Sequence, residues 1–172
     1  MNLNLNELVQ QVNGEFAERF EGRNLDLICI LQPEPLLIRA DSRRIWRVLE
    51  NLYVNVCKYA MPGTRVYVDA IKKDGKIQLS IKNISENPLN FQADELTERF
   101  IRGDVSRSTE GSGLGLSIAK NLTVLQHGSF NIYLDGDLFK VTITFDEAVK
   151  EKKPMPPMIV PEAVQEEAQQ DA

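Results

Sequence analysis

Three polar residues recur on one face of a predicted helix. Asn51, Asn55 and Lys58 stand at positions i, i+4 and i+7, and residues at that spacing share a helix face. Amide oxygens can ligate a hard cation such as Mg²⁺, and a lysine can contact phosphate. The row could therefore line a pocket for metal-bound phosphate, although the same spacing is also typical of a plain solvated face.

A glycine-rich stretch, Glu110-Gly-Ser-Gly-Leu-Gly-Leu116, opens a later predicted helix. Glycines let the backbone approach a ligand closely, and free N–H groups at a helix start favour anions. An ordinary flexible turn is the other interpretation, because glycine-rich helix starts recur in unrelated folds.

Asn83 continues the alternation of Ile77, Leu79 and Ile81 in a predicted strand. Its side chain should therefore face the covered side of a sheet, at the strand end. A buried amide without hydrogen-bonding partners costs about 1–3 kcal/mol. A nucleobase edge would supply such partners, and so would the backbone of the neighbouring turn.

Helices and strands that must position these residues follow from the spacing of apolar side chains. Helices are predicted over 4–22, from Asp41 or Ser42 as N-cap to about Met61, and from about Gly113 to a stop at Gly128. Strands are predicted at 25–31, at 36–38, on both sides of Asp74-Gly75, and on both sides of 135–137. A mixed, mostly antiparallel sheet covered on one face by three helices, an α/β (α+β) two-layer sandwich, is the simplest solution.

The chain divides into a compact part over 1–148 and a tail over 149–172. The tail carries four prolines, a charge cluster and a Glu/Gln/Ala end, which together predict disorder. Within the compact part, the long connection over 84–113 contains a short helical piece at about 92–99, and connections of this length are usually functional or mobile.

Composition and cysteine usage limit the possible functions of the chain. The 172 residues carry a net charge of −5, which argues against a nucleic-acid partner because phosphate binding needs a basic face. Cys29 and Cys57 lie in apolar contexts without metal-like spacing, and we expect both to be reduced core residues. The chain has no run of about 18 apolar residues that would predict a membrane span.

Taken together and in this order, these stretches resemble the ATP-binding catalytic domain of bacterial sensor histidine kinases, of the superfamily that includes gyrase, Hsp90 and MutL and has the Bergerat fold. The resemblance covers about residues 4–146, so that 1–148 would be the catalytic domain. Residues 47–60 look like the family's asparagine box, 99–104 like its phenylalanine box and 111–116 like its second glycine box.

The resemblance implies roles on the second helix for ATP and Mg²⁺. Asn55 would ligate the Mg²⁺ that bridges the phosphates, and Asn51 would support that site from one turn earlier. Lys58 would contact phosphate, and Tyr59 would pack against the adenine side.

It also implies a lid over about 101–112. Phe100 would anchor the lid over the nucleotide, and Arg102 would reach towards the phosphates. Backbone N–H groups would come to the phosphates from four residues of the second glycine box, Gly111, Gly113, Leu114 and Gly115.

One box departs from the family pattern. Where the first glycine box usually reads Asp-X-Gly-X-Gly, the aligned stretch here is Asn83-Ile-Ser-Glu-Asn87. Asparagine keeps an acceptor oxygen for the adenine amino group but loses the charge, and the missing glycines would crowd the pocket edge. Such a degraded box looks like kinases of the Gram-positive branch, and it leaves ATP affinity and base selectivity open.

The phosphoacceptor histidine of the family belongs to a separate dimerising hairpin. The one histidine here, His127, looks like the family's structural His-Gly helix stop. We therefore expect this fragment to be a monomeric cytoplasmic domain that binds ATP without phosphorylating itself. Its partners would be the histidine-bearing dimerisation domain of a homodimeric, membrane-anchored parent and a response regulator.

Three alternatives stay open within the superfamily. The chain could be a nucleotide-sensing pseudokinase, in which the change at Asn83 marks lost catalysis. It could be a serine kinase of the anti-sigma type, which needs no histidine domain. ATP hydrolysis, as in gyrase or MutL, would need a glutamate base where Asn51 stands, although Glu50 is adjacent.

Overall fold

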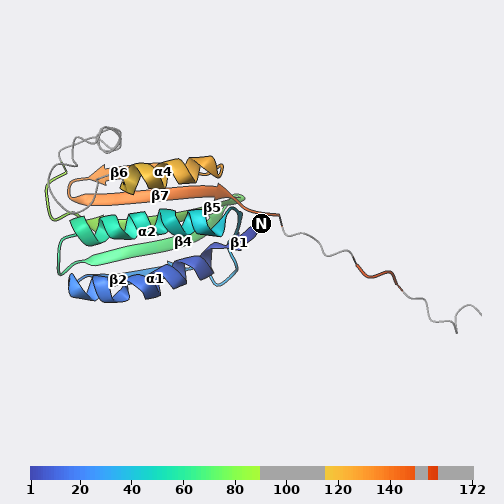
Figure 1. Ribbon diagram of the computed structural model, residues 1–172, viewed down its shortest axis with the longest axis horizontal. Helices are drawn as coiled ribbons and strands as arrows, with labels where there is room; N and C mark the ends of the chain where they lie inside the picture. The colour runs from blue at the N-terminus through green and yellow to red at the C-terminus, as the bar shows by residue number, and fades with distance from the viewer. Residues whose placement is uncertain (90–114, 150–154, 159–172) are drawn as a thin grey trace, which may run out of the picture.

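The computed structural model describes residues 1–89, 115–149 and 155–158. Its helices are α1 (Leu5–Gly22), α2 (Ser42–Tyr59) and α4 (Gly115–Leu125). Its strands are β1 (Asn2–Asn4), β2 (Asp26–Leu31), β3 (Leu37–Arg39), β4 (Arg65–Lys73), β5 (Lys76–Ile84), β6 (Ser129–Asp135) and β7 (Leu138–Asp146). Figure 1 shows the three helices side by side across one face of the sheet.

The main sheet has five strands in the order β2-β4-β5-β7-β6. β2 pairs with β4 in parallel, and the other pairs are antiparallel. The predicted mixed, mostly antiparallel sheet under three helices is thus confirmed. β3 lies outside this sheet and pairs with the three-residue β1. The sequence did not predict β1, because so short a segment has no detectable period.

Strand alternation produces the core. Every second residue of β5 and β7 is buried under the helices, and so are Val66, Val68 and Ala70 of β4. The stripe Ile45, Leu49, Leu52 and Val56 of α2 packs on them. Fully burying each such side chain contributes about 1.5–3 kcal/mol. α2 therefore has a fixed rotation about its axis, and this rotation determines where its polar row lies.

The helix boundaries follow the predicted caps. Asp41 is the N-cap of α2, and its side chain accepts hydrogen bonds from the backbone N–H groups of Arg43 (2.9 Å) and Arg44 (3.1 Å). α2 ends at Tyr59, two residues before the predicted Met61, because Ala60 is extended and forms a bridge with Ser85. At the predicted Asp74-Gly75 hairpin both residues have positive φ, 52° and 71°, as a two-residue type I′ turn requires.

One burial prediction is wrong. Cys29 is exposed, although its neighbours in the chain are apolar, and Cys57 is only half-buried. The reason for Cys29 is that β2 is an edge strand, so one side of the residue has no neighbouring strand. Both cysteines have free thiols.

Several predictions fall on residues that the structure does not describe. The helical piece at 92–99, the start of the third helix at Gly113, and residues 150–154 and 159–172 of the predicted tail lie outside the described residues. Among the residues that are described, no helix is long and apolar enough to cross a membrane.

Candidate functional site

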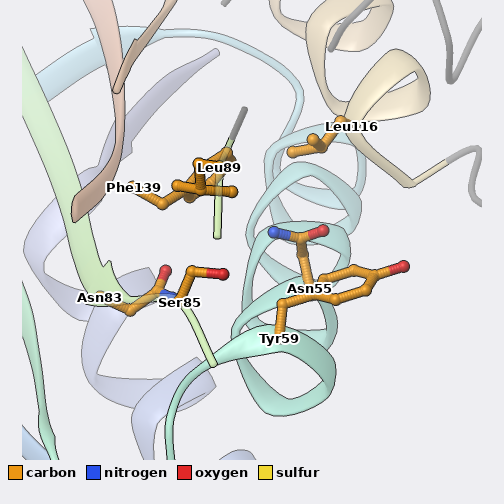
Figure 2. A pocket seen from close by; sticks show the side chains of 7 residues that line it. All are labelled: Asn55, Tyr59, Asn83, Ser85, Leu89, Leu116 and Phe139. Atoms are coloured by element: carbon orange, nitrogen blue, oxygen red, sulfur yellow. The ribbon is translucent and has the colours of Figure 1, made fainter. Parts of the chain in front are cut away.

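A pocket opens between the C-terminal half of α2 and the end of β5 (Figure 2). α2 contributes two lining residues, the end of β5 and the segment after it contribute three, and α4 and β7 contribute one each. The lining residues are Asn55, Tyr59, Asn83, Ser85, Leu89, Leu116 and Phe139. Three of the predicted site residues, Asn55, Tyr59 and Asn83, therefore come together in one place.

Asn83 contributes a buried polar side chain to the pocket lining. Its side chain faces the covered side of the sheet as predicted, and only 3% of the residue is exposed. The Oδ1 atom is buried and, within the described part of the chain, has no hydrogen-bonding partner. A backbone bond in the adjacent turn, which was the other interpretation, is therefore absent for this oxygen. An orphaned acceptor of this kind costs about 1–3 kcal/mol unless a ligand supplies a donor.

Ser85 follows Asn83 at strand spacing and lines the same pocket. Its backbone N–H donates to the carbonyl oxygen of Asp137 (2.7 Å), which fixes the residue in place. Figure 2 shows the Asn83 and Ser85 side chains in the space that faces α2. We did not predict Ser85 as a site residue, although the alternation that identified Asn83 could have found it.

Apolar walls complete the pocket. Leu116 is 1% exposed and Phe139 is 6% exposed, and Leu89 packs against the core. Phe139 lies beside Asn83 because the two residues are register partners in the β5–β7 pair. The sequence did not predict this neighbour, since the pairing joins segments more than fifty residues apart. A flat ring could lie between these apolar walls with its polar edge towards Asn83.

The polar row of α2 divides into three different environments. Asn55 is half-buried and lines the pocket, whereas Lys58 is exposed and is not among the lining residues. Asn51 is half-buried, and its Nδ2 donates to the Arg47 carbonyl oxygen (2.7 Å). Glu50 is exposed and does not line the pocket either.

The first turn of α4 lies next to this row. A Cβ atom at Gly115 would lie 3.5 Å from the Oδ1 atom of Asn51, so the start of α4 meets α2 at the residue one turn before Asn55. Free N–H groups at a helix start favour anions. The other predicted lid and glycine-box residues, Phe100, Arg102, Gly111, Gly113 and Leu114, lie outside the described residues.

The described residues contain no group of three or more His, Cys, Asp or Glu that could hold a metal ion. The amide oxygen of Asn55 is the kind of ligand that Mg²⁺ accepts. Mg²⁺ is commonly held by one or two protein ligands together with substrate phosphates. A donor set of this kind fits a metal that arrives with a phosphate-bearing ligand.

His127 lies at the far end of α4 and ends that helix. It has a φ of 64°, its N–H donates to the Val124 carbonyl oxygen (3.0 Å), and the Gly128 N–H donates to that of Thr123 (3.0 Å). These two bonds form the Schellman motif, with the histidine in the left-handed position. The location agrees with the predicted structural helix stop.

Comparisons with known proteins agree with this fold. A family model described as the histidine kinase-, DNA gyrase B- and HSP90-like ATPases matches residues 40–149. The match takes in more than half of the chain, and the chain belongs to this ATPase family. The predicted family and Bergerat fold are thus confirmed, and the family implies ATP as the ligand.

Named relatives place the chain beside sensor histidine kinases. It is 31% identical over 123 residues to the signal transduction histidine-protein kinase BaeS of Escherichia coli, covering 70% of this chain and 26% of BaeS. The chain thus spans about a quarter of that relative's length. The expected Gram-positive origin of this chain stays a prediction.

Solved structures of the histidine kinase ThkA have the same fold. Its catalytic domain matches with a TM-score of 0.73 at 25% identity, covering 86% of this chain and 95% of that chain. ThkA in complex with the response regulator protein TrrA matches with a TM-score of 0.67 at 24% identity, covering 88% of this chain and 43% of that chain.

Proposed function

We propose that this chain binds ATP with Mg²⁺ in the pocket between α2 and the end of β5, as the catalytic domain of a sensor histidine kinase. The orphaned Oδ1 atom of Asn83 is the observation that carries the proposal. The exocyclic amino group of adenine would donate to that oxygen, and Ser85 would add a hydroxyl beside it. Leu116, Phe139 and Tyr59 would enclose the ring.

The phosphates would extend from the base towards the start of α4. Asn55 would ligate Mg²⁺ through its amide oxygen, with Asn51 supporting the same region from one turn earlier. Mg²⁺ would offset the negative charge of the triphosphate. Lys58 would meet phosphate from the exposed end of the row, and Gly115 would belong to the anion-binding helix start.

Phe100 would anchor a lid over about 101–112 above the nucleotide, and Arg102 would reach towards the phosphates. Backbone N–H groups would come to the phosphates from Gly111, Gly113 and Leu114. In the reaction, an imidazole nitrogen of a histidine outside this chain would attack the γ-phosphorus. The bond from that phosphorus to the β–γ bridging oxygen would break, and ADP would leave. The part of this chain would be to position the nucleotide, because phosphoryl transfer depends mainly on orientation and electrostatic stabilisation.

The parent protein would supply the remaining components. We infer a histidine-bearing dimerisation domain in a homodimeric, membrane-anchored parent, with a response regulator as the receiver of the phosphoryl group. ThkA, which shares the fold, is known in complex with a response regulator. The domain itself would be cytoplasmic and would occupy residues 1–148.

Titration calorimetry with a non-hydrolysable ATP analogue tests the proposal. We expect binding to the wild-type chain that strengthens when Mg²⁺ is added. Asn55→Ala should remove the Mg²⁺-dependent gain and leave the Mg²⁺-independent part, whereas Asn131→Ala, at an exposed position on β6, should change neither. Mg²⁺-dependent affinity that is equal in wild type and Asn55→Ala would exclude the metal-ligand role.

A nucleotide-binding pseudokinase is the second candidate, because Asn83 stands where the family usually has an aspartate. The two functions differ when the parent's histidine-bearing segment and labelled ATP are added to the chain. A kinase gives acid-labile phosphohistidine on that segment, whereas a pseudokinase binds the nucleotide and gives none. A serine kinase of the anti-sigma type would instead give acid-stable phosphoserine on a partner protein.

A further inference from the structure

Arg23 joins two walls of the candidate pocket without lining it. Its Nε donates to the carbonyl oxygen of Cys57 (2.9 Å), and its Nη2 donates to that of Ala60 (3.1 Å). The same Nη2 lies 3.5 Å from the carboxylate oxygen Oε2 of Glu86. Cys57 lies in the last turn of α2, Ala60 is the C-cap of that helix, and Glu86 follows β5 by two residues. One guanidinium therefore contacts both elements that carry the polar pocket residues.

The chemistry of these contacts suits arginine. Carbonyl groups at a helix C-terminus have no partner within the helix and carry partial negative charge. A planar guanidinium can meet two carbonyls and a carboxylate at once, which a lysine ammonium does less well. The bonds to the carbonyls are charge-assisted and stronger than neutral ones, whereas the half-exposed ion pair to Glu86 adds little by itself.

The backbone at the same junction is also paired. The Met61 N–H donates to the Ile84 carbonyl oxygen (2.8 Å), and the Glu86 N–H donates to that of Tyr59 (2.8 Å). Ala60 and Ser85 form an isolated antiparallel bridge between them. The end of α2 and the end of β5 therefore meet at one short junction that Arg23 braces from the side.

Arg23 is itself held in place by the end of α1. It is the C-cap of that helix, and its backbone N–H donates to the carbonyl oxygens of Arg19 (3.1 Å) and Phe20 (3.2 Å). The next residue, Asn24, accepts from the N–H of Gly63 (2.7 Å), in the connection from α2 to β4. The guanidinium thus extends from a fixed backbone, which makes it a brace and not a loosely tethered surface charge.

We propose that Arg23 is a positioning residue for the nucleotide, an inference that rests on the proposed function of the pocket. By fixing the last turn of α2 against the end of β5, it sets the gap between Asn55 and Asn83. Those two side chains would hold the metal-bound phosphates and the base of one ligand. Because one nucleotide must contact both side chains at once, a small change in the gap lowers nucleotide affinity without unfolding the domain.

The test compares Arg23→Gln, Arg23→Lys and Arg19→Gln in the full 172-residue chain. Arg19 is the matched control, since it is exposed on the same helix and its guanidinium lies over the Phe16 ring. Affinity for the non-hydrolysable ATP analogue with Mg²⁺ is measured by calorimetry, at a temperature where thermal unfolding shows every variant folded. Arg23→Gln should weaken binding on the order of tenfold, and Arg19→Gln should leave it within about twofold.

Rescue by lysine separates positioning from general stability. Lysine can replace one of the two carbonyl contacts, so Arg23→Lys should bind more tightly than Arg23→Gln and more weakly than wild type. Should Arg23→Gln not fold, Arg23→Lys carries the test, because a smaller but measurable loss of affinity is expected there. Wild-type affinity in Arg23→Gln, or an equal loss in Arg19→Gln, would overturn the proposal and leave the proposed function intact. A wild-type chain that binds no nucleotide would instead refute the proposed function, and with it this role.

Discussion

Gly115 and Asn51 lie so close that a Cβ atom on the glycine would be 3.5 Å from the Oδ1 atom of the asparagine. The Nδ2 atom of Asn51 donates to the Arg47 carbonyl oxygen, so the amide is held by its own helix. The contact joins the start of α4 to α2 one turn before Asn55. The proposed anion-binding helix start and the proposed metal ligand therefore have a fixed spatial relation.

Substitutions at Gly115 test this relation. A separation of 3.5 Å is an ordinary van der Waals distance, and Gly115 has no positive φ, so Gly115→Ala should fold with an unfolding free energy within about 1 kcal/mol of wild type. Gly115→Val should press against Asn51 and weaken binding of the Mg²⁺-bound ATP analogue on the order of tenfold. Urea denaturation and calorimetry measure the two effects, and equal affinity in both variants would contradict the packing argument.

Asn83 should show a conflict between stability and binding. Replacing a buried, unpaired amide with an apolar side chain of similar size removes a desolvation penalty. Asn83→Leu should therefore raise the free energy of unfolding without nucleotide by about 1 kcal/mol and abolish nucleotide binding. Urea denaturation with and without the ATP analogue measures both.

Asn83→Asp is the matched variant for the base contact. It restores the family's carboxylate, which should lower stability without ligand because a buried charge then lacks a partner. A donor from adenine would offset that loss, so the ATP analogue should stabilise Asn83→Asp more than wild type. If Asn83→Leu still binds the analogue, the base contact lies elsewhere.

The sequence predicted the parts of the site that depend on local periodicity. Asn83 follows from strand alternation and Asn55 from helix spacing, because each pattern repeats within a few residues. Predicting Phe139 as a pocket residue would have required the register between β5 and β7. Predicting the role of Arg23 would have required its contacts with residues more than thirty positions away. Such long-range relations come from tertiary packing, which a single sequence does not encode in any short pattern.

The same distinction explains the fold predictions. The three helices and the strands β5, β6 and β7 have clear periods, whereas β1 is too short to have one. Cys29 looked like a core residue because its chain neighbours are apolar, but the position of β2 at the sheet edge leaves it exposed. Strand order, which decides which strand lies at the edge, is not a local property.

Tyr53 should make the protein sensitive to alkali. Burial raises the pKa of its phenol well above the ordinary range, and the nearby Cys29 thiol adds to the effect when it is charged. The hydroxyl donates to the Oδ1 atom of Asn13. The unfolded chain ionises this tyrosine at pH ~10, whereas the folded chain keeps it protonated. The stabilisation from the buried phenol is therefore complete below pH ~10. It decreases as pH rises further, by up to about 1.4 kcal/mol per pH unit.

Urea denaturation between pH 9 and 11 measures this dependence. Tyr53→Phe should be less stable at neutral pH through loss of the bond to Asn13, but its stability should fall less steeply with rising pH, by about one proton. Tyr133→Phe is the control, because Tyr133 is 55% exposed, and it should keep the wild-type slope. An unchanged slope in Tyr53→Phe would mean that the phenol ionises equally in both states.

His127 and Gly128 should respond in opposite ways to substitution, which separates a structural histidine from a reactive one. His127 is in the left-handed conformation, with φ of 64°, a conformation that costs a non-glycine residue about 1–2 kcal/mol. His127→Gly should therefore raise the free energy of unfolding by up to about 1 kcal/mol, since glycine's own entropy loss offsets part of the gain. A Cβ atom on Gly128 would lie 2.5 Å from the Phe145 ring and 2.9 Å from the Thr123 methyl group, so Gly128→Ala should lower it by about 1–3 kcal/mol.

Nucleotide binding distinguishes a structural role of His127 from a role in contacting the ligand. His127 ends α4 at the opposite terminus from Leu116, the residue of that helix that lines the pocket. His127→Gly should therefore bind the ATP analogue with wild-type affinity while it unfolds at higher urea concentration. A loss of affinity without a change in stability would show instead that the imidazole acts on the ligand, and the helix-stop role would then not account for the residue.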